Sequence, residues 1–181
     1  MEITKRALPF LPYAGVPVIC AALLIRMAGN ADAFLLLKFE LLIMFGYAAA
    51  AHDLKAKRIP NGLVLAMVAA WIAIVTPKLF LDIGAAVGAI AGSALGFATG
   101  GGLFLLVYMI SRKGLGGGDV KFMAASGLYL GFAGAIPAIL YGSVLAALTG
   151  MALMLCKKIG RKDKIPLAPF LYIGMLITIF S

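Results

Sequence analysis

Apolar segments long enough to cross a bilayer fill almost the whole of this 181-residue chain. Hydrophobic residues make up 64% of the sequence, and the mean hydropathy is +1.08. A bilayer-spanning helix needs about 20 predominantly apolar residues, so little of the chain remains for anything but spanning helices and short loops. The 22 glycines suit helices that pack closely in a membrane. We therefore expect a single all-α, polytopic membrane domain over 1–181.

The strong positive charge has its best explanation in membrane topology. The chain has 16 basic and 7 acidic residues, for a net charge of +9. In a soluble protein this excess would suggest nucleic acid, but in a membrane protein Lys and Arg concentrate in cytoplasmic loops. We expect contacts with membrane lipids, anionic ones included, and no nucleic-acid partner. Cys20 and Cys156 have neither the spacing of a metal site nor that of a disulfide framework, so we expect no metal site and no cofactor.

Turn signals divide the apolar sequence into about seven spanning segments. The first resembles a signal peptide, but Arg26 interrupts its end, so we expect an uncleaved helix. We expect Pro77 to end the third, with a short loop over 78–82. The fourth is roughly 42 Å long at 1.5 Å per residue, so it is tilted, kinked at 100–102 or protruding. The expected bounds of five segments are about 10–27, 33–51, 63–76, 83–110 and 165–180.

Residues 120–155 fit either one long helix or a hairpin that turns near 131–134. The first arm of such a hairpin would be short for a full bilayer. With the hairpin, only Arg26, Lys38 and Lys78 of the 16 basic residues lie away from the cytoplasm. This asymmetry favours the hairpin. It predicts a multi-pass protein of the cell's plasma membrane, with the N-terminus inside and the C-terminus outside.

Two aspartates stand at the edges of the apolar segments, each beside basic residues and a helix-breaking stretch. Asp53 precedes a basic run and Pro60, and Asp119 follows a glycine-rich run. A carboxylate next to hydrocarbon is costly and usually marks a functional site. Two crossings separate these residues, which puts both on the same face of the membrane. They can therefore meet in space, although residue 119 is 66 positions beyond residue 53.

Three residue clusters together resemble the type IV prepilin peptidase family, the membrane aspartic proteases with a GxGD motif. The resemblance covers the chain from about residue 33 onward and implies a six-helix protease core plus an N-terminal helix. The chain has no cytoplasmic segment with paired cysteines, a segment associated with N-methylation in many bacterial members. It is similar to the minimal members found with Flp/Tad pilus systems. The matching residues are Asp53 with Ile59-Pro60-Asn61, Gly116-Gly117-Gly118-Asp119-Val120-Lys121, and Pro166 with Pro169-Phe170.

The resemblance implies that Asp53 and Asp119 are a catalytic pair. The expected activity is an endopeptidase that cuts the basic leader from prepilin or pseudopilin substrates at the cytoplasmic face. Two adjacent carboxyl groups cannot both ionise easily, so one keeps a proton. The charged carboxyl takes a proton from water, and the neutral one donates to the scissile carbonyl oxygen. Expected substrate contacts are Gly116, Gly117, Gly118, Lys121, Pro166 and Pro169.

Each cluster also has an ordinary structural explanation. Asp53 can simply pair with Lys57 one helical turn later, the glycines can form a flexible connector, and the prolines can begin a helix. Two other functions stay open: a non-catalytic subunit of a secretion machine, and a small membrane transporter or channel. A transporter is expected to place polar groups at mid-membrane, often with repeats. The separation of the two carboxyl groups distinguishes the protease from the structural subunit.

Overall fold

The computed structural model describes residues 19–24, 33–111, 115–157 and 165–181. These residues are almost entirely helical, and they contain no strand. Four of the helices are long and apolar enough to cross a membrane, so the chain is a polytopic helical membrane protein. Residues 19–24 form a helical turn, while the rest of the expected first span, 10–27, lies outside the described residues. The labelled helices are α3 (Ala33–Ala56), α4 (Asn61–Leu81), α5 (Ile83–Ile110), α6 (Gly117–Leu155) and α7 (Ala168–Phe180).

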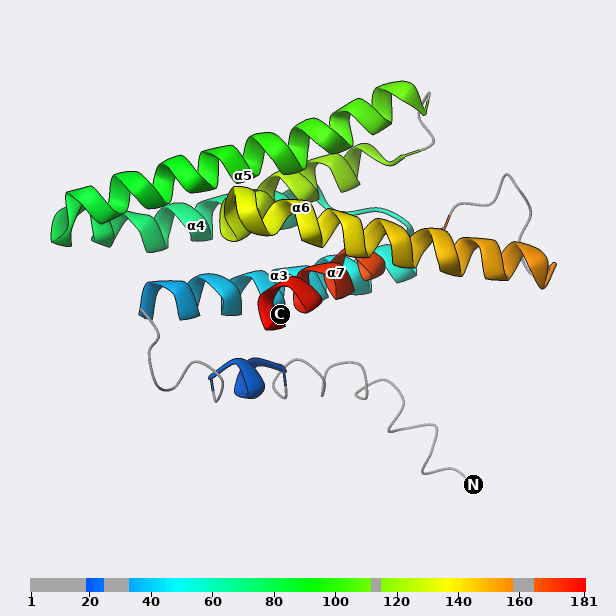
Figure 1. Ribbon diagram of the computed structural model, residues 1–181, viewed down its shortest axis with the longest axis horizontal. Helices are drawn as coiled ribbons and strands as arrows, with labels where there is room; N and C mark the ends of the chain where they lie inside the picture. The colour runs from blue at the N-terminus through cyan, green and yellow to red at the C-terminus, as the bar shows by residue number, and fades with distance from the viewer. Residues whose placement is uncertain (1–18, 25–32, 112–114, 158–164) are drawn as a thin grey trace.

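The helices pack around α6. Helix α5 lies on one side of α6, and α3 and α7 lie together on the other, while α4 contacts α3, α5 and α6 alike (Figure 1). The contacts between α5 and α6 and between α6 and α7 are the most extensive in the bundle. Helix α6 is thus the central helix of the bundle, and its first turn carries Asp119.

Helix α6 is a hairpin of two arms rather than one straight helix. Gly131 has φ 69° and ψ −178°, a left-handed conformation that favours glycine. The chain reverses there, and the second arm returns toward the end at which the first began (Figure 1). The hairpin expected from the charge distribution is therefore confirmed. All residues of the first arm from 122 to 129 are buried, so this arm forms the centre of the bundle.

Small residues allow the first arm of α6 to pack directly against α5. A Cβ atom added to Gly100 would lie 2.5 Å from the carbonyl oxygen of Met123, and Gly96 faces the backbone of Gly127 in the same way. The Tyr129 hydroxyl, on the same arm, donates a 2.6 Å hydrogen bond to the carbonyl oxygen of Met67 in α4. The arm is therefore fixed from two neighbouring helices.

Three expected boundaries are wrong. Helix α3 runs past residue 51 to Ala56, and α4 runs through Pro77 to Leu81, so Asp82 alone separates α4 from α5. A proline is tolerated inside a membrane helix because local adjustments and neighbouring groups satisfy the freed carbonyl. The last helix begins at Ala168 rather than at residue 165, because Pro166 precedes it and Pro169 occupies its first turn.

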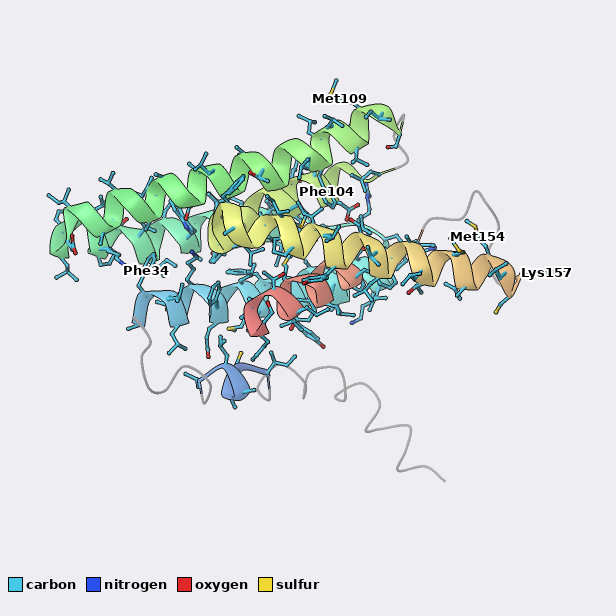
Figure 2. The ribbon with its side chains drawn as sticks, viewed as in Figure 1. Phe34, Phe104, Met109, Met154 and Lys157 are labelled. Atoms are coloured by element: carbon cyan, nitrogen blue, oxygen red, sulfur yellow. The ribbon has the colours of Figure 1, made fainter. Side chains whose placement is uncertain are left out.

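Helix α5 shows how the bundle separates its core from its lipid-facing surface. The helix is continuous through the glycines at 100–102, so the kink considered there is absent. Phe104 is 5% exposed and points into the bundle, whereas Met109 is 71% exposed and points outward (Figure 2). Exposed apolar side chains of this kind are at home in hydrocarbon. The outward surface of a spanning helix can stay apolar, because lipid rather than water surrounds it.

Candidate active site

Asp53 lies in the last turns of α3 and is 5% exposed. The helix ends shortly after it, where Lys57 adopts φ 49° and donates its N–H to the carbonyl oxygen of Asp53 at 2.8 Å. The Lys57 side chain is exposed, and no ion pair joins it to Asp53 within the described part of the chain. Asp53 is therefore not explained by a surface pair with Lys57.

Asp119 is the third residue of α6. Its N–H donates to the carbonyl oxygen of Gly116 at 3.1 Å, which closes the first turn of the helix. A Cβ atom on Gly116 would lie 2.7 Å from Oδ2 of Asp119, so only a glycine leaves room for this carboxyl position. The Asp119 carboxyl is partly buried, and it lies close enough to Asp53 for the two charges to repel each other. The structure thus brings together two carboxyl groups from distant parts of the sequence.

Two contacts hold the connection after Asp53 against residues 116–118 before Asp119, here called the glycine turn. Ile59 is 8% exposed, and a Cβ atom on Gly118 would lie 3.3 Å from its Cβ atom. Next to this contact, the Lys121 ammonium donates a 3.0 Å hydrogen bond to Oδ1 of Asn61, the first residue of α4. The first two sequence motifs therefore interlock through one apolar contact and one hydrogen bond.

The start of α7 completes the site. The backbone N–H of Ala168, which is fully buried, donates a 2.9 Å hydrogen bond to Oδ2 of Asp53. The first N–H groups of a helix have no partner within the helix, so the Ala168 N–H, in the first turn of α7, can donate to the aspartate instead. The third motif thus holds the Asp53 carboxyl in place through backbone rather than through a side chain.

The other residues predicted to contact substrate surround this pair at different depths. Gly117 is exposed, and a Cβ atom on it would meet nothing within 4 Å. Lys121 is also exposed, while Pro166 and Pro169 are partly buried. All of them lie in the three segments that meet at the aspartates, and Gly117 is the one with the most open surroundings.

Sequence reasoning missed Ala168. The two nearby prolines indicated that backbone groups are freed at the start of the last helix, but not which acceptor they reach. The acceptor is 115 positions away along the chain, so no local pattern identifies it. The described residues contain no group of three or more His, Cys, Asp or Glu side chains that could hold a metal ion. What the site offers is a pair of carboxyl groups near enough for the charge on Asp53 to act on Asp119.

Comparisons with known proteins point to one family. The chain is 30% identical over 139 residues to a prepilin leader peptidase/N-methyltransferase of Xanthomonas campestris pv. campestris, covering 75% of this chain and 47% of that protein. It is 32% identical over 130 residues to the protein of the same name from Legionella pneumophila, covering 71% and 44%. A third relative with this name, from Bacillus subtilis, is 33% identical over 88 residues, covering 48% and 34%.

The chain spans about half the length of these curated relatives, or less. No solved structure matches it significantly. The model of the type IV leader peptidase family matches residues 40–151, which include both aspartates and the glycine turn. This chain belongs to the type IV leader peptidase family.

Proposed function

We propose that this protein is a membrane-embedded aspartic endopeptidase that removes the basic leader from type IV prepilin-like substrates. The observation that carries the proposal is the meeting of Asp53 and Asp119, each held by a different motif, at one end of the bundle. Family membership and the printed names of the relatives support a prepilin or pseudopilin peptide as the substrate. Membrane lipids surround the bundle, and nucleic acid has no part in this function.

The chemistry needs only the two carboxyl groups and a water molecule. The ionised carboxyl accepts a proton from the water as it attacks the scissile carbonyl carbon. The neutral carboxyl donates its proton to the carbonyl oxygen. The tetrahedral intermediate then collapses, and the leaving amine takes a proton from the pair. The Ala168 N–H limits the freedom of the Asp53 carboxyl throughout, which keeps the reacting groups in their productive geometry.

The glycine turn is well suited to hold an extended substrate. A peptide bond inside a helix is hidden by its own hydrogen bonds, so the cut must fall where the substrate chain is extended. The open surroundings of Gly117 allow a strand-like segment to approach the backbone closely. In this proposal Gly116 and Gly118 shape the turn, Lys121 contacts the substrate backbone, and Pro166 and Pro169 form the opposite wall.

The proposal is tested by incubating the purified, full-length protein with candidate prepilins from the same genome. The products are identified by mass spectrometry. Release of the basic leader at a single peptide bond supports the proposed function. Intact substrates throughout, with a protein shown to be folded, would contradict it and would favour a non-catalytic subunit.

We infer that the active site faces the cytoplasm of a plasma-membrane protein. Lys55, Lys57 and Arg58 are exposed at the end of α3 that carries Asp53, as expected for a cytoplasmic connection. Reporter fusions after Arg58 should therefore give a cytoplasmic signal, and fusions near Lys78 and Gly134 an external one. A cytoplasmic signal at Gly134 would contradict this orientation, because the turn of α6 would then lie on the wrong side.

Gly116→Ala should lower the rate of cleavage by roughly 100-fold, because the new methyl group displaces the Asp119 carboxyl. A misplacement of about 1 Å can cost a reaction about this factor in rate. Steady-state rates on the cleaved prepilin measure the loss. Gly117→Ala meets no atom, so any smaller loss there reports on the approach of substrate rather than on Asp119. Gly88→Ala, in open space on α5, is the control and should keep full activity. Equal activities for Gly116→Ala and Gly88→Ala would remove the proposed reason for glycine at 116.

A further inference from the structure

An apolar hollow of about 390 Å³ lies between α4, α5 and the first arm of α6. Two further hollows adjoin it. One, at Asn61 and Leu65, shares Val68 and Lys121 with the first, and the other, at Ile72, shares Val68 and Phe97. Val68 lines all three hollows, which are here together called the α4–α5 groove.

One end of the α4–α5 groove lies at residues that directly follow Asp119 in the chain, and the groove runs from there into the apolar part of the bundle. At its mouth are Val120 and Lys121, which directly follow Asp119, and Asn61, which holds the Lys121 ammonium. Along α4 the lining extends from Asn61 to Ile72, which is roughly 16 Å or three helical turns. Lys121 is the one charged residue among those that line the three hollows.

Small residues make the floor of the groove. Ala98 and Gly101 of α5 face Ala124 of α6, and a Cβ atom on Gly101 would lie 2.8 Å from the Cβ of Ala124. Small residues let helices approach closely within a membrane, where packing rather than hydrophobic burial drives association. The floor is thus the kind of surface that receives another helix, and in the described bundle no helix of this chain covers it.

We propose that the substrate carries an apolar helix immediately after the cut and that the α4–α5 groove binds this helix. The proposal rests on the proposed function and says how the substrate is held. A substrate that keeps an apolar helix in the bilayer must reach Asp119 from the membrane side, and one end of the groove is lined by Val120 and Lys121, which directly follow Asp119. The substrate helix occupies the groove, and its chain becomes extended at the mouth. There Lys121 donates to its backbone carbonyls, and the glycine turn receives the bond to be cut.

Filling the groove should impair a substrate that has the apolar helix more than one that lacks it. The probes are two synthetic peptides with the same basic leader and cleavage sequence, one followed by an apolar helix and one ending before it. The wild-type enzyme should prefer the longer peptide. Ala98→Trp should reduce that preference, expressed as the ratio of kcat/KM values, by at least about tenfold and chiefly through KM, because several apolar contacts are lost.

Ala91→Trp is the matched control. Ala91 is exposed on the same helix, two turns from Ala98, and does not line the groove. It should keep the wild-type preference. An unchanged preference in Ala98→Trp would overturn the groove proposal while leaving the endopeptidase in place. If the wild-type enzyme cuts neither peptide, the proposed function fails instead. The groove proposal is then tested by photo-crosslinking, which does not depend on cleavage.

Photo-crosslinking detects the occupant without relying on cleavage. Phe97, which is 45% exposed, lines the groove, and Leu95, which is 58% exposed, lies two residues away on a different face of α5. Each is replaced in turn by p-benzoylphenylalanine in the full-length protein in lipid vesicles. The longer peptide should crosslink at position 97 at least about tenfold more than at 95. Capture of lipid alone at 97, or equal capture of peptide at both positions, would overturn the proposal.

Discussion

Asp53→Asn and Asp119→Asn should each lower the rate of leader cleavage by roughly 10²–10⁴-fold, the range that one general acid or base contributes. The amide has nearly the shape of the carboxyl but cannot exchange a proton with water or with the scissile carbonyl. At position 53 the amide oxygen can still accept the Ala168 N–H, so the start of α7 keeps its contact. Rates with purified variants on the cleaved prepilin measure the effect, and circular dichroism shows that the helices remain.

Asp82→Asn is the matched control for the two aspartate variants. Asp82 precedes α5, at the end opposite the α5–α6 connection, and accepts the Ala85 N–H at 3.0 Å. Asparagine caps a helix about as well as aspartate, so this variant should cleave at nearly the wild-type rate. Near-normal cleavage by Asp53→Asn or Asp119→Asn would remove that residue from the catalytic pair. A loss in Asp82→Asn as large as theirs would show that the assay reports on folding instead.

Hydropathy and charge were sufficient to predict the helical membrane fold and the hairpin of α6. The hairpin is the more instructive case, because residues 120–155 alone do not distinguish one helix from two. The distribution of basic residues outside that segment decided between them, and the left-handed conformation of Gly131 agrees with the result. A global constraint, the sidedness of Lys and Arg, thus resolved a local ambiguity.

Predictions from local sequence failed where the membrane environment or a contact with a distant residue determined the structure. Pro77 was expected to end a helix, yet α4 continues to Leu81, because the membrane environment strongly favours keeping the remaining backbone hydrogen bonds. The destination of the Ala168 N–H depends on how α7 packs against α3, which no pattern near residue 168 contains. The proximity of the two aspartates was therefore predictable, whereas the group that positions one of them was not.

Gly96→Ala and Gly127→Ala should each destabilise the bundle strongly. A Cβ atom on either glycine would overlap the backbone of the other helix, since Gly96 faces the carbonyl of Gly127 and Gly127 faces that of Gly96. Overpacked cores usually cost about 1–3 kcal/mol, and we expect about 3 kcal/mol here because a backbone carbonyl cannot rotate away as a side chain can. Unfolding in sodium dodecyl sulfate, followed by the fluorescence of Trp71, the single tryptophan, measures the loss.

The same contact connects stability with catalysis. Gly127 lies on the arm of α6 that carries Asp119, so a shift of this arm away from α5 also moves Asp119 relative to Asp53. Cleavage should therefore fall in Gly96→Ala and Gly127→Ala even under conditions where most of the protein remains folded. Gly88→Ala, which meets no atom on the same helix α5, should change neither the unfolding midpoint nor the rate. If Gly96→Ala unfolds at the wild-type midpoint, the two helices are not in direct backbone contact at this point, and the first arm of α6 must be held by other contacts, such as the Tyr129 hydrogen bond to α4.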